Sequence, residues 1–172
     1  IQTENPKHAL RTWEMLIEEQ GPSEEALRRL SEANLTIDNY NVAINALKDL
    51  LELQNQIPNP QYPISQTYSN LGTLLAAHNP AAAPPYLLQA AQLAPQKRTP
   101  LRQLAFAIQR ALPKKEPAFT LLEAGRQLGG QGLWSLAAHA FQQATQLRPD
   151  YAEAWAYLGE ATYHNDPEHP EN

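Results

Sequence analysis

The hydrophobic and polar positions of this chain follow a helical period. Apolar residues recur three and four positions apart in successive segments, and the strict alternation that predicts strands is missing. Prolines separate the segments, because proline lacks an amide donor and clashes with the preceding helical turn. The pattern predicts an all-α protein of about nine helices, at residues 7–20, 23–34, 38–54, 64–78, 82–94, 100–112, 117–130, 133–147 and 152–164.

Several predicted helices begin with residues that satisfy or replace the free amides of a first turn. These start signals are Asn5-Pro6, Ser23 followed by Glu24 and Glu25, Asp38, and Thr99-Pro100. The proline-rich segment "QIPNPQYP" at 56–63 predicts a stiff connector between two helices.

The helix-ending prolines are regularly spaced. Pro22, Pro58, Pro95 and Pro149 are separated by 36, 37 and 54 residues. The first two intervals are near the ~34-residue unit of a helix-turn-helix array, and the third equals one such unit plus one helix. We therefore predict an α-α superhelix of antiparallel helix pairs, with an off-period additional helix near 100–112 that kinks or breaks the solenoid.

The residues at these intervals resemble the tetratricopeptide repeat family. Its pattern places Leu-Gly on a first helix, then Ala-x3-Phe-x2-Ala and a closing Pro on the second. Residues 118–149 carry it as Leu121, Ala124, Gly125, Leu128, Ala137, Phe141, Ala144 and Pro149. Trp155, Leu158 and Gly159 open the next unit, where Thr162 replaces the usual aromatic residue.

A further match needs a one-residue deletion and places Pro84-Pro85 inside or at the start of a second helix, which we expect to be short. It consists of Tyr68, Leu71, Gly72, Leu75, Ala83, Leu87, Ala90 and Pro95. The resemblance implies one helical-repeat domain over 1–172. Its parts are degenerate repeats at 1–58, a unit at 64–95, a basic additional helix at 97–115, a unit at 117–149, a first helix at 150–164 and a frayed tail at 165–172.

The repeat pattern also predicts how helices pack. Gly125 and Ala137 let two backbones approach closely, and Phe141 or Trp155 fills the remaining space. We expect Trp155 and Gly159 to dock back onto the helix that carries Phe141. On that basis Gly159→Leu overpacks a helix crossing and costs about 1–3 kcal/mol.

Composition narrows the classes of function. The chain has 172 residues with 18 acidic and 13 basic side chains, so no global positive field attracts nucleic acid or an anionic membrane. Cysteine is absent, which excludes disulfides and thiol nucleophiles. No apolar run approaches the ~20 residues that span a bilayer. We expect no nucleic-acid partner and no membrane insertion; the compartment stays open, with the cytoplasm favoured.

Candidate chemistry is sparse. The "GGQG" at 129–132 lacks the Lys-Ser/Thr and the strand of a phosphate loop and predicts a turn between helices. His164, Asp166, Glu168 and His169 carry metal-ligand atoms, but a proline-broken tail would not hold their geometry. Glutamates such as Glu18, Glu19, Glu24 and Glu25 fall in helical first turns or on solvent faces. We predict no catalysis, metal or cofactor.

In the tetratricopeptide family, one face of each first helix lines a concave groove that takes an extended peptide or a partner helix. The positions that the resemblance implies here are Gln66, Ser69, Thr73, Phe119, Leu122, Arg126, Glu153, Ala156 and Glu160. The Lys, Asn and Arg set with which some members capture a carboxyl terminus is not matched. Alternatively, the additional helix covers Phe119 and Leu122.

The additional helix has its own surface. Leu101, Leu104, Ala105, Ile108 and Leu112 form a packing stripe. Arg102, Phe106 and Arg110 align on the opposite side, and six of the 13 basic residues fall between Lys97 and Lys115 with no acid. Either the arginine stems simply lie across Phe106 in solvent, or this face docks an acidic partner.

Two functions stay open. The chain is either a scaffold that binds a peptide or partner protein, or the docking or regulatory segment of a larger enzyme or secretion or assembly protein. Because it begins at Ile1 within what resembles a second helix and stops after a first helix, we expect a fragment. Self-association through open repeat ends is a further expectation.

Overall fold

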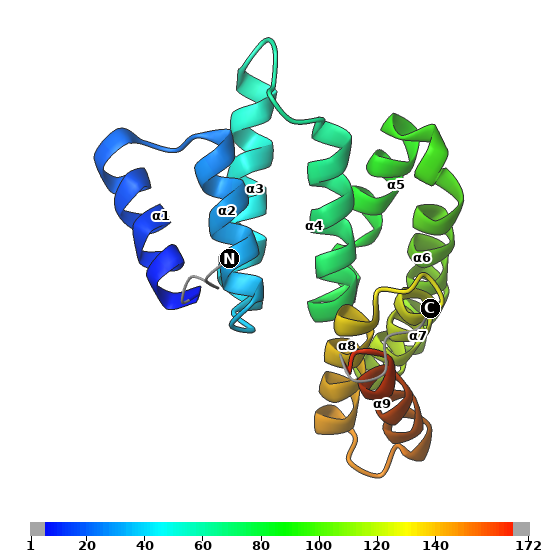
Figure 1. Ribbon diagram of the computed structural model, residues 1–172. Coiled ribbons are helices and arrows are strands. Elements are labelled where there is room, and N and C mark those ends of the chain that lie inside the picture. The colour runs from blue at the N-terminus through cyan, green and yellow to red at the C-terminus, as the bar shows by residue number, and fades with distance from the viewer. Residues whose placement is uncertain (1–5, 167–172) are drawn as a thin grey trace. The chain divides into compact units, whose positions relative to one another are not determined.

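The computed structural model describes residues 6–166, with side chains from residue 8 onward (Figure 1). Over this range the chain forms nine α-helices and three short 3-10 helices, and no strand. The all-α prediction is confirmed. The α-helices are α1 (Pro6–Gln20), α2 (Glu24–Leu35), α3 (Tyr40–Gln56), α4 (Ile64–His78), α5 (Pro84–Leu93), α6 (Arg98–Ala111), α7 (Pro117–Gly129), α8 (Trp134–Leu147) and α9 (Ala152–His164).

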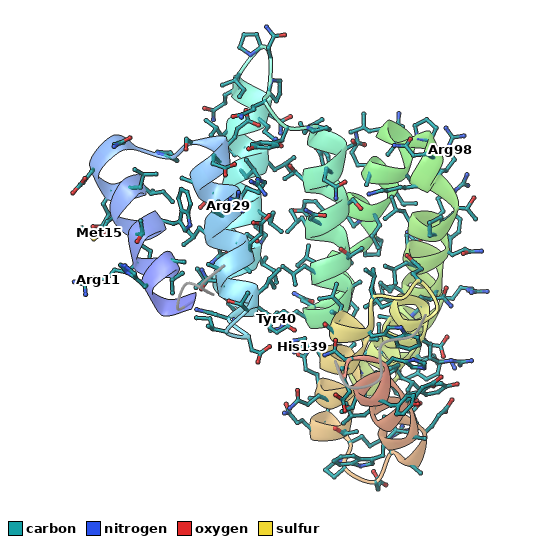
Figure 2. All side chains as sticks on the ribbon, viewed as in Figure 1. Arg11, Met15, Arg29, Tyr40, Arg98 and His139 are labelled. Atoms are coloured by element: carbon teal, nitrogen blue, oxygen red, sulfur yellow. The ribbon has the colours of Figure 1, made fainter. Side chains whose placement is uncertain are left out.

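The chain divides into two compact units, and the boundary between Leu71 and Gly72 falls inside α4. In the first unit α1 packs on α2, and α2 packs on α3 (Figure 1). On α1 the side chains of Arg11 and Met15 extend away from α2 (Figure 2). The core of this unit is aliphatic and includes Ala26, Leu27, Ala43, Ile44, Leu47 and Leu50.

A buried carboxylate holds the connector that follows α3. Glu24 accepts hydrogen bonds from Gln54 Nε2 at 2.8 Å and from the backbone amide of Gln61 at 2.7 Å. Burial alone would raise the pKa of Glu24, but these hydrogen bonds outweigh burial and lower it. Glu24 lies in a helical first turn, as predicted, yet its side chain is buried rather than solvated. The proline-rich connector is therefore fixed by contacts as well as by composition.

The neighbouring Glu25 forms an ion-pair cluster on the same turn. It accepts hydrogen bonds from the Tyr62 hydroxyl, from Arg28 Nη2 and from Arg29 Nε. These bonds lower the pKa of Glu25 to about 2. The cluster ties the end of the connector to α2.

In the second unit, helices that are neighbours in sequence pack on each other from α5 to α9. Helix α5 begins at Pro84 and has only 10 residues, which confirms the short helix predicted there. Helix α6 lies between α5 and α7, with its predicted stripe inward. Its buried residues include Leu101, Leu104, Ala105 and Ile108.

Two glycines mark close helix crossings in the second unit. A Cβ added at Gly125 of α7 would lie 2.5 Å from Phe141 Cε1 of α8. At Gly72 of α4 it would lie 2.9 Å from the Leu87 side chain of α5. The predicted close approach at Gly125, filled by Phe141, is confirmed. The "GGQG" segment forms a turn, as predicted, and Gly132 has the positive φ of 75° that favours glycine.

The predicted packing of α9 is wrong. Trp155 is 52 % exposed, and a Cβ at Gly159 would meet nothing within 4 Å. Instead, Ala154 and Ala161 are buried, and the Tyr157 ring stacks on Phe141 at 5.4 Å between centroids. Helix α9 therefore docks on α8 through the opposite side from that expected. Because space beside Gly159 is open, the predicted overpacking by Gly159→Leu is withdrawn.

The predicted start of α3 is also wrong by two residues. Asp38 has a φ of 57°, outside helical values, and α3 begins at Tyr40. Residues 36–38 complete the end of α2, whereas Asn39 precedes α3 directly: its backbone amide donates to the Asn34 carbonyl at 2.9 Å and its carbonyl accepts from the Ala43 amide at 3.1 Å. Ser23 does cap α2, since its hydroxyl oxygen accepts from the Ala26 amide at 3.2 Å. The expected cap at Asn5 lies outside the described residues.

Candidate partner-binding face

Helices α7 and α9 contact each other beside α8 and leave one polar and aromatic surface open to solvent. We call this surface the α7–α9 face. Helix α7 contributes to it through one side, the connector before α9 adds two residues, and α9 contributes its first two turns. Its members are Phe119, Glu123, Arg126, Arg148, Tyr151, Glu153 and Tyr157.

Cations lie over aromatic rings along this face. The Arg126 guanidinium carbon is 5.4 Å from the Tyr157 ring centroid, and that of Arg148 is 3.3 Å from the Tyr151 centroid. At the other end, the Lys114 ammonium is 3.6 Å from the Phe119 centroid. Such pairs hold long side chains in place while leaving their polar ends accessible.

Carboxylates alternate with these cations. Arg126 Nη1 donates to Glu123 Oε1 at 3.0 Å, and Glu123 and Glu153 help to raise the pKa of Arg126 against the opposing effect of burial. Burial also raises the pKa of Tyr151, partly offset by Arg148. Tyr151 and Arg126 are therefore in their neutral and cationic forms, respectively, at neutral pH.

The side chains of the α7–α9 face offer groups that can bind a peptide or a protein. Guanidinium groups and carboxylates offer hydrogen bonds to peptide amides and carbonyls, and the ring edges offer apolar contact. Exposed and half-exposed ion pairs of this kind contribute little to folding, so a partner that replaces them loses little. The arrangement suits an extended peptide or a helix.

The structure separates the predicted groove residues by exposure. Leu122 is fully buried and Ser69 is 7 % exposed, so neither is accessible to a partner. The burial of Leu122 is compatible with the alternative of coverage by the additional helix, since α6 packs on α7. The other predicted positions have exposed or half-exposed side chains: Gln66, Thr73, Phe119, Arg126, Glu153, Ala156 and Glu160.

The groove residues of α4 are described separately, because the boundary between the two units runs through that helix. Gln66 and Ser69 belong to the first unit and Thr73 to the second. The candidate face is therefore restricted to α7 and α9.

The exposed face of α6 agrees with the simpler alternative, in which an arginine stem lies across Phe106 in solvent. The Arg102 guanidinium carbon lies 5.3 Å from the Phe106 ring centroid, while Phe106 remains 42 % exposed. Arg110 lies one turn further along the same side. Docking of an acidic partner stays a prediction.

Sequence reasoning missed a histidine pair. His78 Nδ1 lies 3.1 Å from His139 Nε2, and burial lowers the pKa of His78 (His139 is labelled on α8 in Figure 2). The His78 ring borders a cavity of about 370 Å³ that is also lined by Leu112, Thr120 and Leu147. The two histidines are 61 positions apart in sequence, so no local signal identifies the pair.

Between residues 6 and 166, no three His, Asp or Glu side chains group as metal ligands would. Glu168 and His169 of the considered tail site lie outside the described residues. In the same part of the chain, no helix combines the length and apolarity needed to cross a bilayer.

In comparisons with known proteins, no family model matches the chain and no curated protein matches it significantly. The fold and the face thus define an all-helical protein whose helices pack in sequence, nine of them over the described residues.

Proposed function

We propose that this chain is a tetratricopeptide-type repeat module that binds a peptide or partner protein along the α7–α9 face. The repeat assignment is supported by spacing and by contacts. Gly125 and Gly159 are 34 residues apart, which is the length of one unit of such an array. At Gly125 and Gly72, the side chain of the helix paired with each glycine fills the space in front of it.

The binding assignment depends mainly on one observation. Three cation–aromatic pairs occur on and beside α7 and α9, and apart from the buried Tyr151 their side chains remain partly exposed. Buried pairs would be explained by folding alone, whereas accessible Arg and Tyr side chains are the residues that dominate binding energy at protein interfaces.

The test is selection of peptides from a random library on the immobilised chain, followed by affinity measurement by fluorescence polarisation. We expect selected peptides to lose about thirtyfold in affinity for the double variant Arg126→Ala, Tyr157→Ala, because each side chain contributes about 1 kcal/mol at a partly desolvated contact. Lys48→Ala is the matched control, since Lys48 is an exposed residue of α3.

The proposal fails if no peptide is enriched over an empty support. It fails equally if the enriched peptides bind the double variant as tightly as the unmodified chain and the Lys48→Ala control.

A further inference from the structure

The outward side of α9 is apolar and exposed. Trp155 and Tyr163 are 52 % and 54 % exposed, and Gly159 lies between them on the same side of the helix. Only open space lies within 4 Å of a Cβ at Gly159. We call Trp155, Gly159 and Tyr163 the α9 open stripe.

Two sites in the same unit show what covers such a glycine. Gly125 is covered by Phe141, and Gly72 is covered by Leu87. In both cases the covering residue is large, apolar and carried by an α-helix. Since Gly159 follows Gly125 by one 34-residue period, the expected occupant of the α9 open stripe is a helix that presents a large apolar side chain.

The charge beside the stripe specifies the occupant further. Glu153 and Glu160 are exposed on one edge of α9, one on each side of its middle turn. A complementary helix therefore carries arginine or lysine near its large apolar residue.

Helix α6 of this chain has these properties. Phe106 is 42 % exposed, with Arg102 one turn before it and Arg110 one turn after it on the same side. Next to Phe106 lies an open hollow of about 400 Å³, lined also by Leu88, Ala91 and Arg102. The hollow offers space for a large side chain from the opposite surface, such as Trp155.

We propose that the α9 open stripe of one copy binds α6 of a second copy, with Phe106 seated over Gly159 and the arginines beside Glu153 and Glu160. The two surfaces differ, so the contact is head-to-tail and each bound copy offers a free α6 and a free α9. Association then extends beyond a dimer as concentration rises, unless the rotation closes a ring.

Sedimentation velocity tests this from low micromolar to several hundred micromolar concentration. The unmodified chain is expected to show a sedimentation coefficient that increases with concentration. Two charge-reversed variants, Arg102→Glu with Arg110→Glu and Glu153→Arg with Glu160→Arg, are each expected to require about tenfold higher concentration for the same increase. Lys48→Glu, a charge reversal on α3, is expected to associate like the unmodified chain.

An equimolar mixture of the two charge-reversed variants supplies the decisive arm. In the mixture, the glutamates on α6 of the first variant face the arginines on α9 of the second, and the native glutamates on α9 of the first face the native arginines on α6 of the second. Opposite charges therefore meet at both contacts, and association is expected to recover. Gly159→Leu, whose side chain enters open space in the single copy, is expected to remain folded by circular dichroism yet to associate more weakly.

A chain that stays monomeric at every concentration overturns the proposal. So does association that is unchanged by both charge reversals, which would indicate another surface, or a mixture that fails to recover although both variants are folded. Glu153 belongs to both surfaces, but the peptide test substitutes Arg126 and Tyr157, which lie outside the α9 open stripe, so the two proposals can fail independently.

Discussion

In the proposed repeat, helices α7 and α9 occupy equivalent positions one period apart, but only α7 is covered on its glycine side. Phe141 presses against Gly125, whereas Gly159 faces open space. At the position one turn before each glycine, Leu121 is buried and Trp155 is 52 % exposed. On the repeat proposal, the sequence pattern indicates which side of a helix can accept a neighbouring helix. Whether a neighbouring helix lies there has to be seen in the structure.

The largest expected difference concerns the two aromatic residues near these glycines. Phe141 is 2 % exposed and fills the crossing at Gly125, so Phe141→Ala is expected to lower the free energy of unfolding by about 3–5 kcal/mol. Trp155→Ala is expected to lower it by less than about 1 kcal/mol, because the exposed ring contributes chiefly one hydrogen bond from Nε1 to the Pro149 carbonyl.

Urea denaturation followed by circular dichroism measures both values in dilute solution, where self-association is weakest. Similar losses of stability in the two variants would contradict the expected difference, since they would mean that Trp155 is as well packed as Phe141.

A smaller expected effect is a pH dependence of stability that involves α8, the helix that covers α7. Helix α8, which covers α7, also meets the end of α4 through the His78–His139 contact. Burial lowers the folded-state pKa of His78 below 6.5, so its neutral form is favoured by folding. The resulting stability is present above pH 6.5 and is lost as the pH falls below that value.

The expected loss is no more than about 1.4 kcal/mol per pH unit. Denaturation midpoints at pH 7.5 and 5.5 test this, with His78→Gln expected to flatten the dependence. His8→Gln, on the exposed side of α1, is the matched control. An equal pH dependence in the chain and in His78→Gln would show that His78 is not its source.

Much of the fold followed from the spacing of apolar residues and prolines. The ranges predicted for α4 and α9, residues 64–78 and 152–164, agree with the structure. The exception at Asp38 has a physical reason, because residues 36–38 complete the end of α2 through backbone hydrogen bonds to carbonyls such as that of Asn34. A single residue type cannot reveal which of two helices will use it.

The candidate face followed from the sequence only in part. Arg126, Glu153 and Phe119 were placed there by resemblance, while Tyr157 and Lys114, the partners of Arg126 and Phe119, became visible only in the structure. Leu122 is the counterexample: its helical angle predicted a side chain on the exposed face, but the side chain is buried in the structure, where α6 packs on α7. Contacts between helices decide such cases.

We propose that α7 and α9 are equivalent helices of one repeat and differ in whether another helix covers the glycine side. Paired glycine substitutions test this proposal most directly. Gly125→Leu forces a side chain into Phe141 and is expected to lower the free energy of unfolding by about 1–3 kcal/mol. Gly159→Leu enters open space and, because leucine favours helix more than glycine, is expected to raise it by about 0.5–1 kcal/mol. Opposite signs in urea denaturation of dilute protein are the predicted result; a loss of similar size in both variants would contradict it.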